Sequence, residues 1–236
     1  MNGSIVAHGT PPYYWGVSEA TYISWALDRL NVPSPIIGKA RSGDHSTVFE
    51  IASDNARWFL KIGGNLAPEY ARLQWLQGRL PVPEAVGFDR FDEQEALLMS
   101  GVPGTNLAVL AKRLSPHKIV EMLATALRAF HSADPADCPF KATIPGQSLV
   151  HGDACLPNIM CGDDGTVNGY IDLGAMGVGD VEVDLAAAVW SLQYNLRADH
   201  GLQFLRAYGL PNPTDEDVQR LRAMYATGEV GPAANS

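Results

Sequence analysis

The sequence predicts an α+β fold in two lobes, a small antiparallel sheet followed by a mainly helical region. Residues 36–62 and 81–100 contain short runs of strand-forming residues separated by polar turns. The segment 101–104, Gly-Val-Pro-Gly, then breaks regular structure, and apolar residues beyond it recur mostly with helical spacing. Strands followed by a break and then by helices indicate a lobe boundary there. The length of 236 residues suits one domain or two small lobes.

The overall composition limits the classes of protein to which the chain can belong. A hydrophobic content of 46% with 18% charged residues is typical of a globular protein. The formal charge of -9 argues against a nucleic-acid partner and suits a cationic small molecule. Cys138, Cys155 and Cys161 form neither a disulfide framework nor a zinc-site spacing. No signal-peptide pattern or membrane-length apolar run is present, so we expect a cytoplasmic monomer or homodimer without a membrane partner.

The segment 1–34 is predicted to form a loose arm and one helix. Residues 1–16 carry no periodicity, whereas Ser18 is a typical N-cap residue for a helix that Pro33 follows. Apolar residues at helical spacing predict one buried face on this helix. The residues of the predicted face are Ile23, Ala26, Leu27 and Leu30.

Residues 35–101 are predicted to form the first lobe, with strands at 47–51 and 57–62. The stretch 38–46 is rich in Gly and Ser, and we predict a loop there. Such a loop between two strands can cover phosphates with its backbone N–H groups, or it can be a plain turn. Its candidate nucleotide-binding residues are Ser42, Gly43 and Ser46.

Residues 102–227 are predicted to form the second lobe, and the small, polar segment 228–236 a frayed tail. The connector 132–147 carries prolines and no helical periodicity. Asp180 and Asp184 stand where a helix begins, so their negative charge is expected to interact favourably with the helix dipole. The predicted helices are 116–131, with Ser115 as N-cap, 181–194, 202–207 and 215–224.

The densest pattern of reactive side chains begins at Asp153, within the sequence His-Gly-Asp. Asn158 follows five residues later, and Asp172 begins the sequence Asp-Leu-Gly. Between them, 159–161 and 169–171 are predicted to be two strands around a Gly-Asp-Asp-Gly turn. Such a hairpin would bring Asn158 and Asp172 together at its open end. Taken singly, a loop Asp or Asn could simply cap a turn.

These residue types suit phosphoryl transfer, which needs positioning and charge neutralisation more than covalent help. Asp153 on a loop could orient a substrate hydroxyl and accept its proton. Asn158 and Asp172 offer hard oxygens to Mg²⁺, which would bridge the phosphates of a nucleotide. The spacing resembles the protein-kinase catalytic loop, His-x-Asp with Asn five residues after the Asp, followed downstream by Asp-x-Gly.

The kinase resemblance also gives roles to residues of the first lobe. Lys61 lies inside an apolar strand, where a lysine is otherwise an edge residue extended toward solvent. Glu69 opens a helix eight residues later, so the two match the pair that holds the α- and β-phosphates. The segment between the lobes would offer backbone groups to adenine, the alternative being a bare linker. Its candidate nucleotide-binding residues are Met99, Ser100 and Val102.

The chain as a whole resembles the aminoglycoside O-phosphotransferases, especially the 3′-hydroxyl kinases of kanamycin and neomycin, over roughly residues 35–225. The segments that carry the resemblance are 70–76, 80–83, 130–132, 150–160, 169–174 and 207–210. It implies a two-lobed protein-kinase-like fold, ATP or GTP as phosphoryl donor, Mg²⁺, and phosphorylation of a sugar hydroxyl that confers antibiotic resistance. By position it implies these roles: catalytic base, Asp153; metal ligands, Asn158 and Asp172; phosphate-holding pair, Lys61 and Glu69; acceptor binding, Asp153 and Glu229.

The sequence departs from this family on the acceptor side of Asp153. Relatives carry a long, acidic, largely helical insertion before the His-Gly-Asp loop, whereas here only 19 residues separate His131 from His151. The family often has Arg after Asp-x-Gly, where this chain has Ala175. The next helix, where relatives place charged groups, has Trp190, Tyr194 and Asn195. With fewer charged partners for the antibiotic, we expect any aminoglycoside activity to have a high KM.

Three functions are compatible with the sequence. The chain could be a kinase of an aminoglycoside, a kinase of another small alcohol or antibiotic, or a nucleotide-binding protein with little transferase activity. The intact set of Asp153, Asn158 and Asp172 argues against the third. Measuring ADP and GDP release with a panel of alcohols, and weighing the products, would separate all three.

Overall fold

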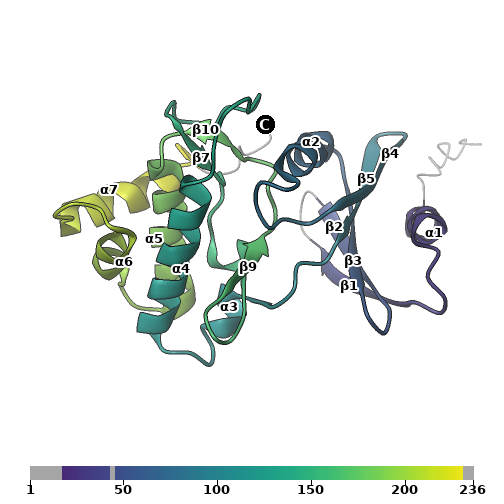
Figure 1. Cartoon of the computed structure of the whole chain (residues 1–236), viewed down its shortest axis with the longest axis horizontal. Coiled ribbons are helices and arrows are strands. Elements are labelled where there is room, and N and C mark those ends of the chain that lie inside the picture. The colour runs from purple at the N-terminus through teal and green to yellow at the C-terminus, as the bar shows by residue number, and fades with distance from the viewer. Residues whose placement is uncertain (1–17, 43–45, 231–236) are drawn as a thin grey trace, which may run out of the picture.

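The structure, a computed structural model, describes residues 18–42 and 46–230, and of Arg41 and Ser42 only the backbone. Figure 1 shows two lobes side by side, a sheet with two helices on the right and a mainly helical group on the left. The predicted α+β class is therefore confirmed. Among the described residues, no helix is both long enough and apolar enough to cross a membrane. The predicted arm at 1–16 lies outside the described residues.

The first lobe is built on one antiparallel sheet of five strands. In spatial order the strands are β1 (Ile36–Ser42), β2 (Ser46–Ala52), β3 (Arg57–Gly63), β5 (Gln94–Ser100) and β4 (Ala85–Phe91). The predicted loop at 38–46 is wrong over most of its length. Gly38 lies opposite Glu50, and Lys39 lies opposite Phe49 in the ladder. Pairing with the half-buried β2 outweighs the weak strand preference of this Gly- and Ser-rich segment.

Strand β5 is buried on both of its faces and divides the lobe into two apolar layers. Because successive side chains of a strand point to opposite faces, Ala96 and Leu98 face one layer, and Leu97 and Met99 face the other. Helix α1 (Glu19–Leu30) covers the first layer, and helix α2 (Ala67–Leu76) belongs to the second. The second layer continues without interruption into the helical lobe, which fixes α2 between the two lobes (Figure 1).

Helix α1 buries a stripe that overlaps the predicted one but is centred one residue away. Tyr22, Trp25 and Ala26 are its buried residues, whereas Ile23 and Leu27 are only half-buried. The two aromatic rings supply the larger apolar surfaces and meet Phe91 edge-on, at centroid distances of 4.8 and 5.9 Å. The helical period of the apolar residues was predicted correctly. The centre of the buried stripe was displaced by one residue because the prediction left out Tyr22 and Trp25.

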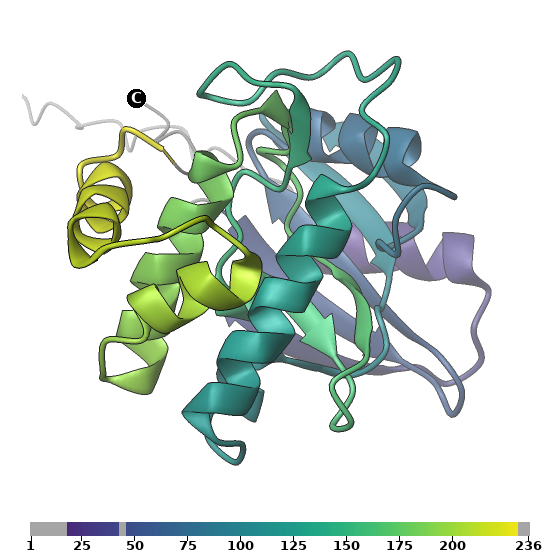
Figure 2. The same ribbon diagram turned by 60° about the vertical axis from the view of Figure 1, so that its left-hand side comes forward.

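The second lobe contains most of the helices and several short strands. Its elements are β6 (Thr105–Asn106), α3 (Leu107–Leu110), α4 (Pro116–His131), β7 (Ser148–Val150), the 3₁₀ turn η1 (Leu156–Asn158), β8 (Ile159–Cys161), β9 (Val167–Tyr170), β10 (Gly177–Gly179), α5 (Glu182–Leu196), α6 (Gly201–Tyr208) and α7 (Asp215–Ala226). Helix α5 lies among α4, α6 and α7, as Figure 2 shows. Nine of its residues are buried, so it forms the centre of the lobe.

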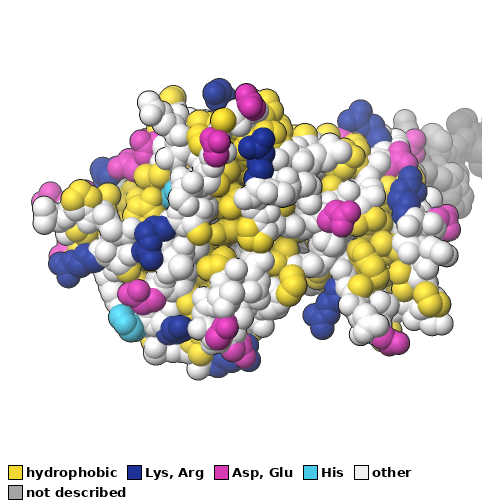
Figure 3. Space-filling view, viewed as in Figure 1, with side chains coloured by type: hydrophobic (Ala, Val, Ile, Leu, Met, Phe, Trp, Pro, Cys, Tyr) yellow, Lys and Arg dark blue, Asp and Glu magenta, His cyan; other side chains and the backbone are white. Residues whose placement is uncertain are grey.

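The predicted cap of α4 is confirmed, whereas Ser18, the predicted N-cap of α1, makes no side-chain hydrogen bond to its helix. Ser115 caps α4 by accepting the N–H of Lys118, and Gly209 ends α6 with a φ of +102°. The connector 132–147 contains no helix, as predicted, and touches β10 through a bridge at Lys141. The predicted fraying of the tail is wrong for Val230, which is 2% exposed because it packs against the core beside α7. Figure 3 shows acidic and basic side chains interspersed on the face turned to the viewer.

Candidate active site

A glycine lets the loop after β7 pass close to the chain that follows Asp172. Gly152 has a φ of +87°, in the left-handed region that glycine adopts without strain. A Cβ atom at this position would lie 2.4 Å from the carbonyl oxygen of Ala175. A side chain is thus excluded here, and the loop that carries Asp153 lies directly against the segment that follows Asp-Leu-Gly.

Asp184, in the first turn of α5, holds this loop by its backbone. The carboxylate has no exposed surface and accepts the N–H groups of His151 and Gly152 at 2.7 and 2.8 Å. The Nε2 atom of His131, at the end of α4, lies 2.9 Å from the same carboxylate. A buried charge is stable where hydrogen bonds surround it, so anchoring the loop is the main role of Asp184, and the predicted helix-dipole role was incomplete.

Asp180 lies at the start of α5, as predicted from the sequence. Its Oδ1 atom accepts the N–H of Glu182 at 2.9 Å, at the start of α5. One signal could have distinguished the two aspartates. Asp184 stands among Val183, Leu185 and further apolar residues, and an acid within an apolar helical run is buried only with partners.

His151 joins the two halves of the predicted motif. Its Nε2 atom lies 3.0 Å from the carbonyl oxygen of Ile171, which can only accept, so Nε2 carries the proton. Its Nδ1 atom then accepts the N–H of Asp153 at 3.3 Å. Ile171 in turn donates its N–H to the carbonyl oxygen of Asn158 at 3.0 Å. The hairpin of β8 and β9 therefore brings Asn158 and Asp172 together at its open end, as predicted.

The carboxylate of Asp153 is held through both of its oxygens. The Nδ2 atom of Asn158 donates to Oδ2 at 3.1 Å and to the backbone carbonyl of Asp153 at 2.9 Å. The hydroxyl of Tyr225, in α7, donates to Oδ1 at 3.0 Å. Hydrogen bonds to both oxygens fix the orientation of the carboxylate. No sequence pattern pointed to Tyr225, because it lies 72 residues further along the chain.

Three charged side chains from the two lobes meet beside this carboxylate. The Nζ atom of Lys61, in β3, lies 2.7 Å from Glu69 of α2 and 2.9 Å from Asp172. Burial lowers the pKa of Lys61, but the negative charges of Glu69 and Asp172 outweigh it and raise the pKa above its usual value. Burial also pushes the pKa of Glu69 upward against the pull of Lys61. The 2.7 Å contact keeps this pair ionised.

Asp172 occupies an uncommon backbone conformation. Its φ is +62°, in the left-handed region that residues other than glycine seldom adopt. Such conformations persist where the surrounding structure enforces them, and they cluster at functional sites. Asp172 lies two residues after the end of β9, and its side chain, 42% exposed, lies at the cleft.

Helix α2 is anchored at its start and in its middle, which holds Glu69 close to Asp172. At its start, Glu95 of β5 accepts the N–H groups of Leu66 and Ala67 at 2.5 and 2.8 Å. These are N–H groups that a helix leaves without an internal partner. One turn further along, Arg72 donates to the carbonyl oxygen of Met176 at 2.6 Å, in the second lobe. The guanidinium of Arg72 also lies 4.6 Å from the ring centre of Phe140, in the connector.

The two candidate metal ligands, Asp172 and Asn158, suit Mg²⁺ rather than a metal ion whose ligands all come from the protein. Among the described residues, no cluster of three or more His, Cys, Asp or Glu side chains could hold a metal ion. Magnesium commonly needs only one or two carboxylates and takes its other ligands from phosphates and water. Asp172 offers a carboxylate, and the amide nitrogen of Asn158 is turned to Asp153, so its oxygen is the atom suited to a cation.

The predicted nucleotide-binding residues of the first lobe are only partly described. Gly43 lies outside the described residues, and Ser42 and Ser46 end β1 and begin β2 on either side of it. Between the lobes, Met99 is buried. Ser100 and Gly101 donate their N–H groups to Glu84 and Arg57, within the first lobe. Among the residues predicted to contact adenine, Val102 is therefore the one whose N–H group could bind the adenine ring.

A cleft of about 200 Å³ opens in front of Asp153. The side chains that line it are Asp153, Cys155, Pro157, Asn158, Asp172, Trp190, Ser191, Tyr194 and Asn195. A second hollow of about 350 Å³ adjoins it and shares Trp190 and Tyr194, with Gln193 and Arg197 as its other lining residues. Glu229, predicted to bind the acceptor, is exposed just after α7 and does not line either hollow.

Comparison with known proteins identifies the class of this site. Residues 37–146 and 140–223 match the model of the phosphotransferase enzyme family, and the chain belongs to that family. It is a phosphotransferase that acts on hydroxyl groups, with a kinase-like fold.

Individual members of the family show which kinds of phosphotransferase this chain is similar to. An aminoglycoside 3′-phosphotransferase of Niallia circulans is 30% identical, with 76% of this chain and 86% of that protein aligned. One of Enterococcus faecalis is 28% identical, over 63% of this chain and 76% of that protein. Among solved structures, an aminoglycoside 3′-phosphotransferase of type VIII aligns with a TM-score of 0.69 at 20% identity, covering 86% of this chain and 98% of that one. At that identity the structural match supports the fold alone.

Proposed function

We propose that the protein transfers the γ-phosphoryl group of ATP or GTP to a hydroxyl of an aminoglycoside such as kanamycin or neomycin. The observation that carries the proposal is the meeting of Asp153, Asn158 and Asp172 with the Lys61–Glu69 pair at one cleft. Relatives at 28–30% identity are aminoglycoside 3′-phosphotransferases. A structural neighbour, at 22% identity, was solved with ADP and streptomycin.

In this proposal the first lobe and the metal-binding residues hold the nucleotide. Lys61, oriented by Glu69, would contact the α- and β-phosphates and exchange part of its contact with Asp172 for them. Asp172 and the amide oxygen of Asn158 would hold Mg²⁺. When bound, the ion would neutralise charge on the phosphates. The backbone near Val102 would meet the purine ring, and Ser42, Gly43 and Ser46 would cover the phosphates.

Asp153 would act on the acceptor. An oxygen of the acceptor hydroxyl forms a bond to the γ-phosphorus while the bond from that phosphorus to the bridging oxygen of the nucleoside diphosphate breaks. The hydroxyl proton passes to the carboxylate of Asp153. Asn158 and Tyr225 hold this carboxylate at 3.1 and 3.0 Å, so little reorganisation is needed when the acceptor arrives.

The acceptor side also supports a second candidate, a kinase of the same fold that acts on another small alcohol or antibiotic. The connector 132–147 contains no helix that could add an acidic wall. Of the described side chains that line the cleft, those other than Asp153 and Asp172 are uncharged. A third candidate, a nucleotide-binding protein with little transferase activity, has no comparable support, because the three site residues are assembled. We expect the protein to work in the cytoplasm, as a monomer or homodimer, where ATP is supplied.

An assay of ADP and GDP release, with kanamycin, neomycin and other alcohols, tests these candidates. The proposal predicts release that depends on the aminoglycoside and a product heavier by one phosphoryl group. Release that depends on another alcohol would support the second candidate. Slow release that no acceptor stimulates, with no phosphorylated product, would support the third.

A further inference from the structure

Three aromatic side chains form a continuous surface on the acceptor side of Asp153. We call this surface, formed by Trp190 and Tyr194 of α5 and Tyr225 of α7, the aromatic wall. The rings of Trp190 and Tyr194 are stacked, with centroids 5.2 Å apart and planes 7° apart. The ring of Tyr225 lies 5.0 Å from that of Trp190 at 37°. Two helices far apart in the sequence thus contribute to one face.

The aromatic wall reaches the reacting carboxylate and extends outward from it. The hydroxyl of Tyr225 donates a 3.0 Å hydrogen bond to Asp153. Trp190 and Tyr194 line both the cleft that contains Asp153 and the hollow beside it. Tyr194 is 55% exposed, so its ring is open to a ligand. A molecule whose hydroxyl reaches Asp153 would therefore lie along this wall.

The acidic side chains around the aromatic wall are fewer than a ligand with several positive charges would be expected to need. Within the two hollows, the acidic side chains are Asp153 and Asp172, which the proposed function already uses. The remaining polar side chains, Ser191 among them, are neutral except Arg197. Its guanidinium lies 5.1 Å from the ring centre of Tyr194, at the outer end of the wall. The described residues therefore do not offer several ion pairs to one acceptor on this face.

We propose that the aromatic wall binds the reacting amino-sugar ring of the acceptor by apolar packing, and that Tyr225 positions Asp153 for that ring. The proposal deepens the proposed function and rests on it. The rings of the wall pack on one another, so they offer an acceptor their apolar edges, against which the C–H groups of a saturated sugar ring can pack. Contact with the wall thus takes the place of the charged partners that the short connector does not supply.

The surroundings of Tyr225 keep its hydroxyl a donor to Asp153. Burial and the neighbouring groups Cys155 and Asp153 raise the pKa of the phenol well above its usual value, so it stays protonated. Its single proton is given to Asp153, and the Sγ atom of Cys155 lies 3.4 Å from the phenol oxygen. Burial raises the pKa of Cys155 as well, so this thiol keeps its proton, and the carbonyl oxygen of Ala187, 3.9 Å away, accepts it.

Variants of Tyr225 and Trp190 separate positioning from ring contact. Tyr225→Phe keeps the ring and removes the hydroxyl, so we expect kcat with kanamycin to fall about 10-fold, with KM for kanamycin within about twofold. Trp190→Ala removes the central ring of this apolar surface, so we expect KM to rise about 10-fold with kcat within about twofold. Trp190→Phe should restore most of the affinity. A merely structural role would not divide kcat from KM in this way.

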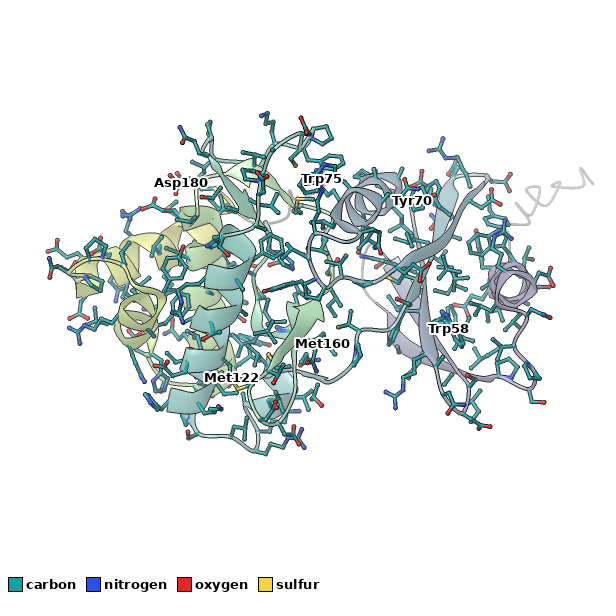
Figure 4. All side chains as sticks on the ribbon, in the orientation of Figure 1. Trp58, Tyr70, Trp75, Met122, Met160 and Asp180 are labelled. Atoms are coloured by element: carbon teal, nitrogen blue, oxygen red, sulfur yellow. The ribbon has the colours of Figure 1, made fainter. Side chains whose placement is uncertain are left out.

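Two residues of α2 supply matched controls, Tyr70→Phe and Trp75→Phe. Tyr70 is stacked on Phe88 and its hydroxyl accepts a hydrogen bond from Gln74, while Trp75 lies under Arg79. Figure 4 shows both on the helix above the sheet, in the other lobe from the aromatic wall. We expect both controls to keep kcat and KM within about twofold of the wild type, because neither side chain lines the cleft or the adjoining hollow and Phe keeps an aromatic ring in the core.

Calorimetry with kanamycin, in the presence of a non-hydrolysable ATP analogue, gives a readout that does not need turnover. The rise in Kd caused by Trp190→Ala should be the same at about 0.05 M and about 1 M salt, because apolar packing is not screened while ion pairs are. An effect that disappears at high salt would overturn the proposal. An unchanged Kd and KM in Trp190→Ala would also overturn it, as would a change in oligomeric mass without a change in Kd, which would make the wall an interface between copies.

The same experiments distinguish this proposal from the proposed function. If the wild type phosphorylates kanamycin and Trp190→Ala leaves its KM unchanged, the aromatic wall is refuted and the proposed function stands. If no acceptor is phosphorylated but kanamycin binding still depends on Trp190, the proposed function fails and the wall stands. If kanamycin and neomycin do not bind at all, the wall is refuted as an amino-sugar site.

Discussion

Replacing Asp184 with Asn tests whether a buried carboxylate holds the loop that carries Asp153. The carboxylate accepts the N–H groups of His151 and Gly152 and lies 2.9 Å from Nε2 of His131. An amide keeps one acceptor oxygen and turns an NH₂ group toward a donor. A hydrogen bond to a charged acceptor contributes about 1.5–3 kcal/mol, and an orphaned buried donor costs about 1–3 kcal/mol.

From these contacts we expect Asp184→Asn to lower the free energy of unfolding by about 2–4 kcal/mol. For a chain of this size that corresponds to a fall in Tm of about 4–16 °C. Because the loop carries Asp153, we expect kcat to fall about 10-fold while KM for the nucleotide is retained, since displacement of a reacting group acts on turnover. Thermal unfolding and steady-state kinetics measure both.

Asp180→Asn is the matched control, because Asp180 is half-buried, at the start of the same helix, and needs only one acceptor oxygen for Glu182. We expect it to change the free energy of unfolding by less than about 0.5 kcal/mol. If Asp184→Asn and Asp180→Asn behaved alike in Tm and in kcat, the anchoring role of Asp184 would be wrong.

Other expectations follow from the same site. Asp153→Asn should lower kcat by about 10²–10⁴-fold with unchanged nucleotide affinity, and a loss of about threefold or less would exclude it as base. Asp172→Ala should abolish transfer, and excess Mg²⁺ should partly rescue Asn158→Ala; equal losses that Mg²⁺ does not affect would contradict shared ligation. Burial raises the pKa of Cys161 to about 11, so iodoacetamide at pH 8 should label half-buried Cys138 first, as mass spectrometry can check; prior labelling of Cys161 would contradict this.

The parts of the site that were predictable are those set by short spacing along the chain. Lys61 and Glu69 stand eight residues apart on a strand and the following helix, and they meet at 2.7 Å. Asn158 and Asp172 flank one hairpin, whose pairing could be expected from its turn. Such contacts depend on local structure that the sequence pattern determines.

The parts that were missed depend on how distant helices pack. Asp184 reaches the loop from α5, and Tyr225 reaches Asp153 from α7, so neither has a spacing signature. Trp190 and Tyr194 were recognised as departures from the family, but their union with Tyr225 requires the packing of α7 on α5. The strand β1 was missed for a related reason, because its partner β2 outweighs the preference of Gly38 and its neighbours.

Phosphorus NMR and mass spectrometry of kanamycin after incubation with ATP and Mg²⁺ test the central claim most directly. We predict one phosphate ester on a ring hydroxyl with the wild type and with Tyr70→Phe, and a rate lower by about 10²-fold or more with Asp153→Asn. Equal product with the wild type and Asp153→Asn would contradict the assignment of the base. ADP release without any phosphate ester on kanamycin or neomycin would contradict the proposed reaction itself.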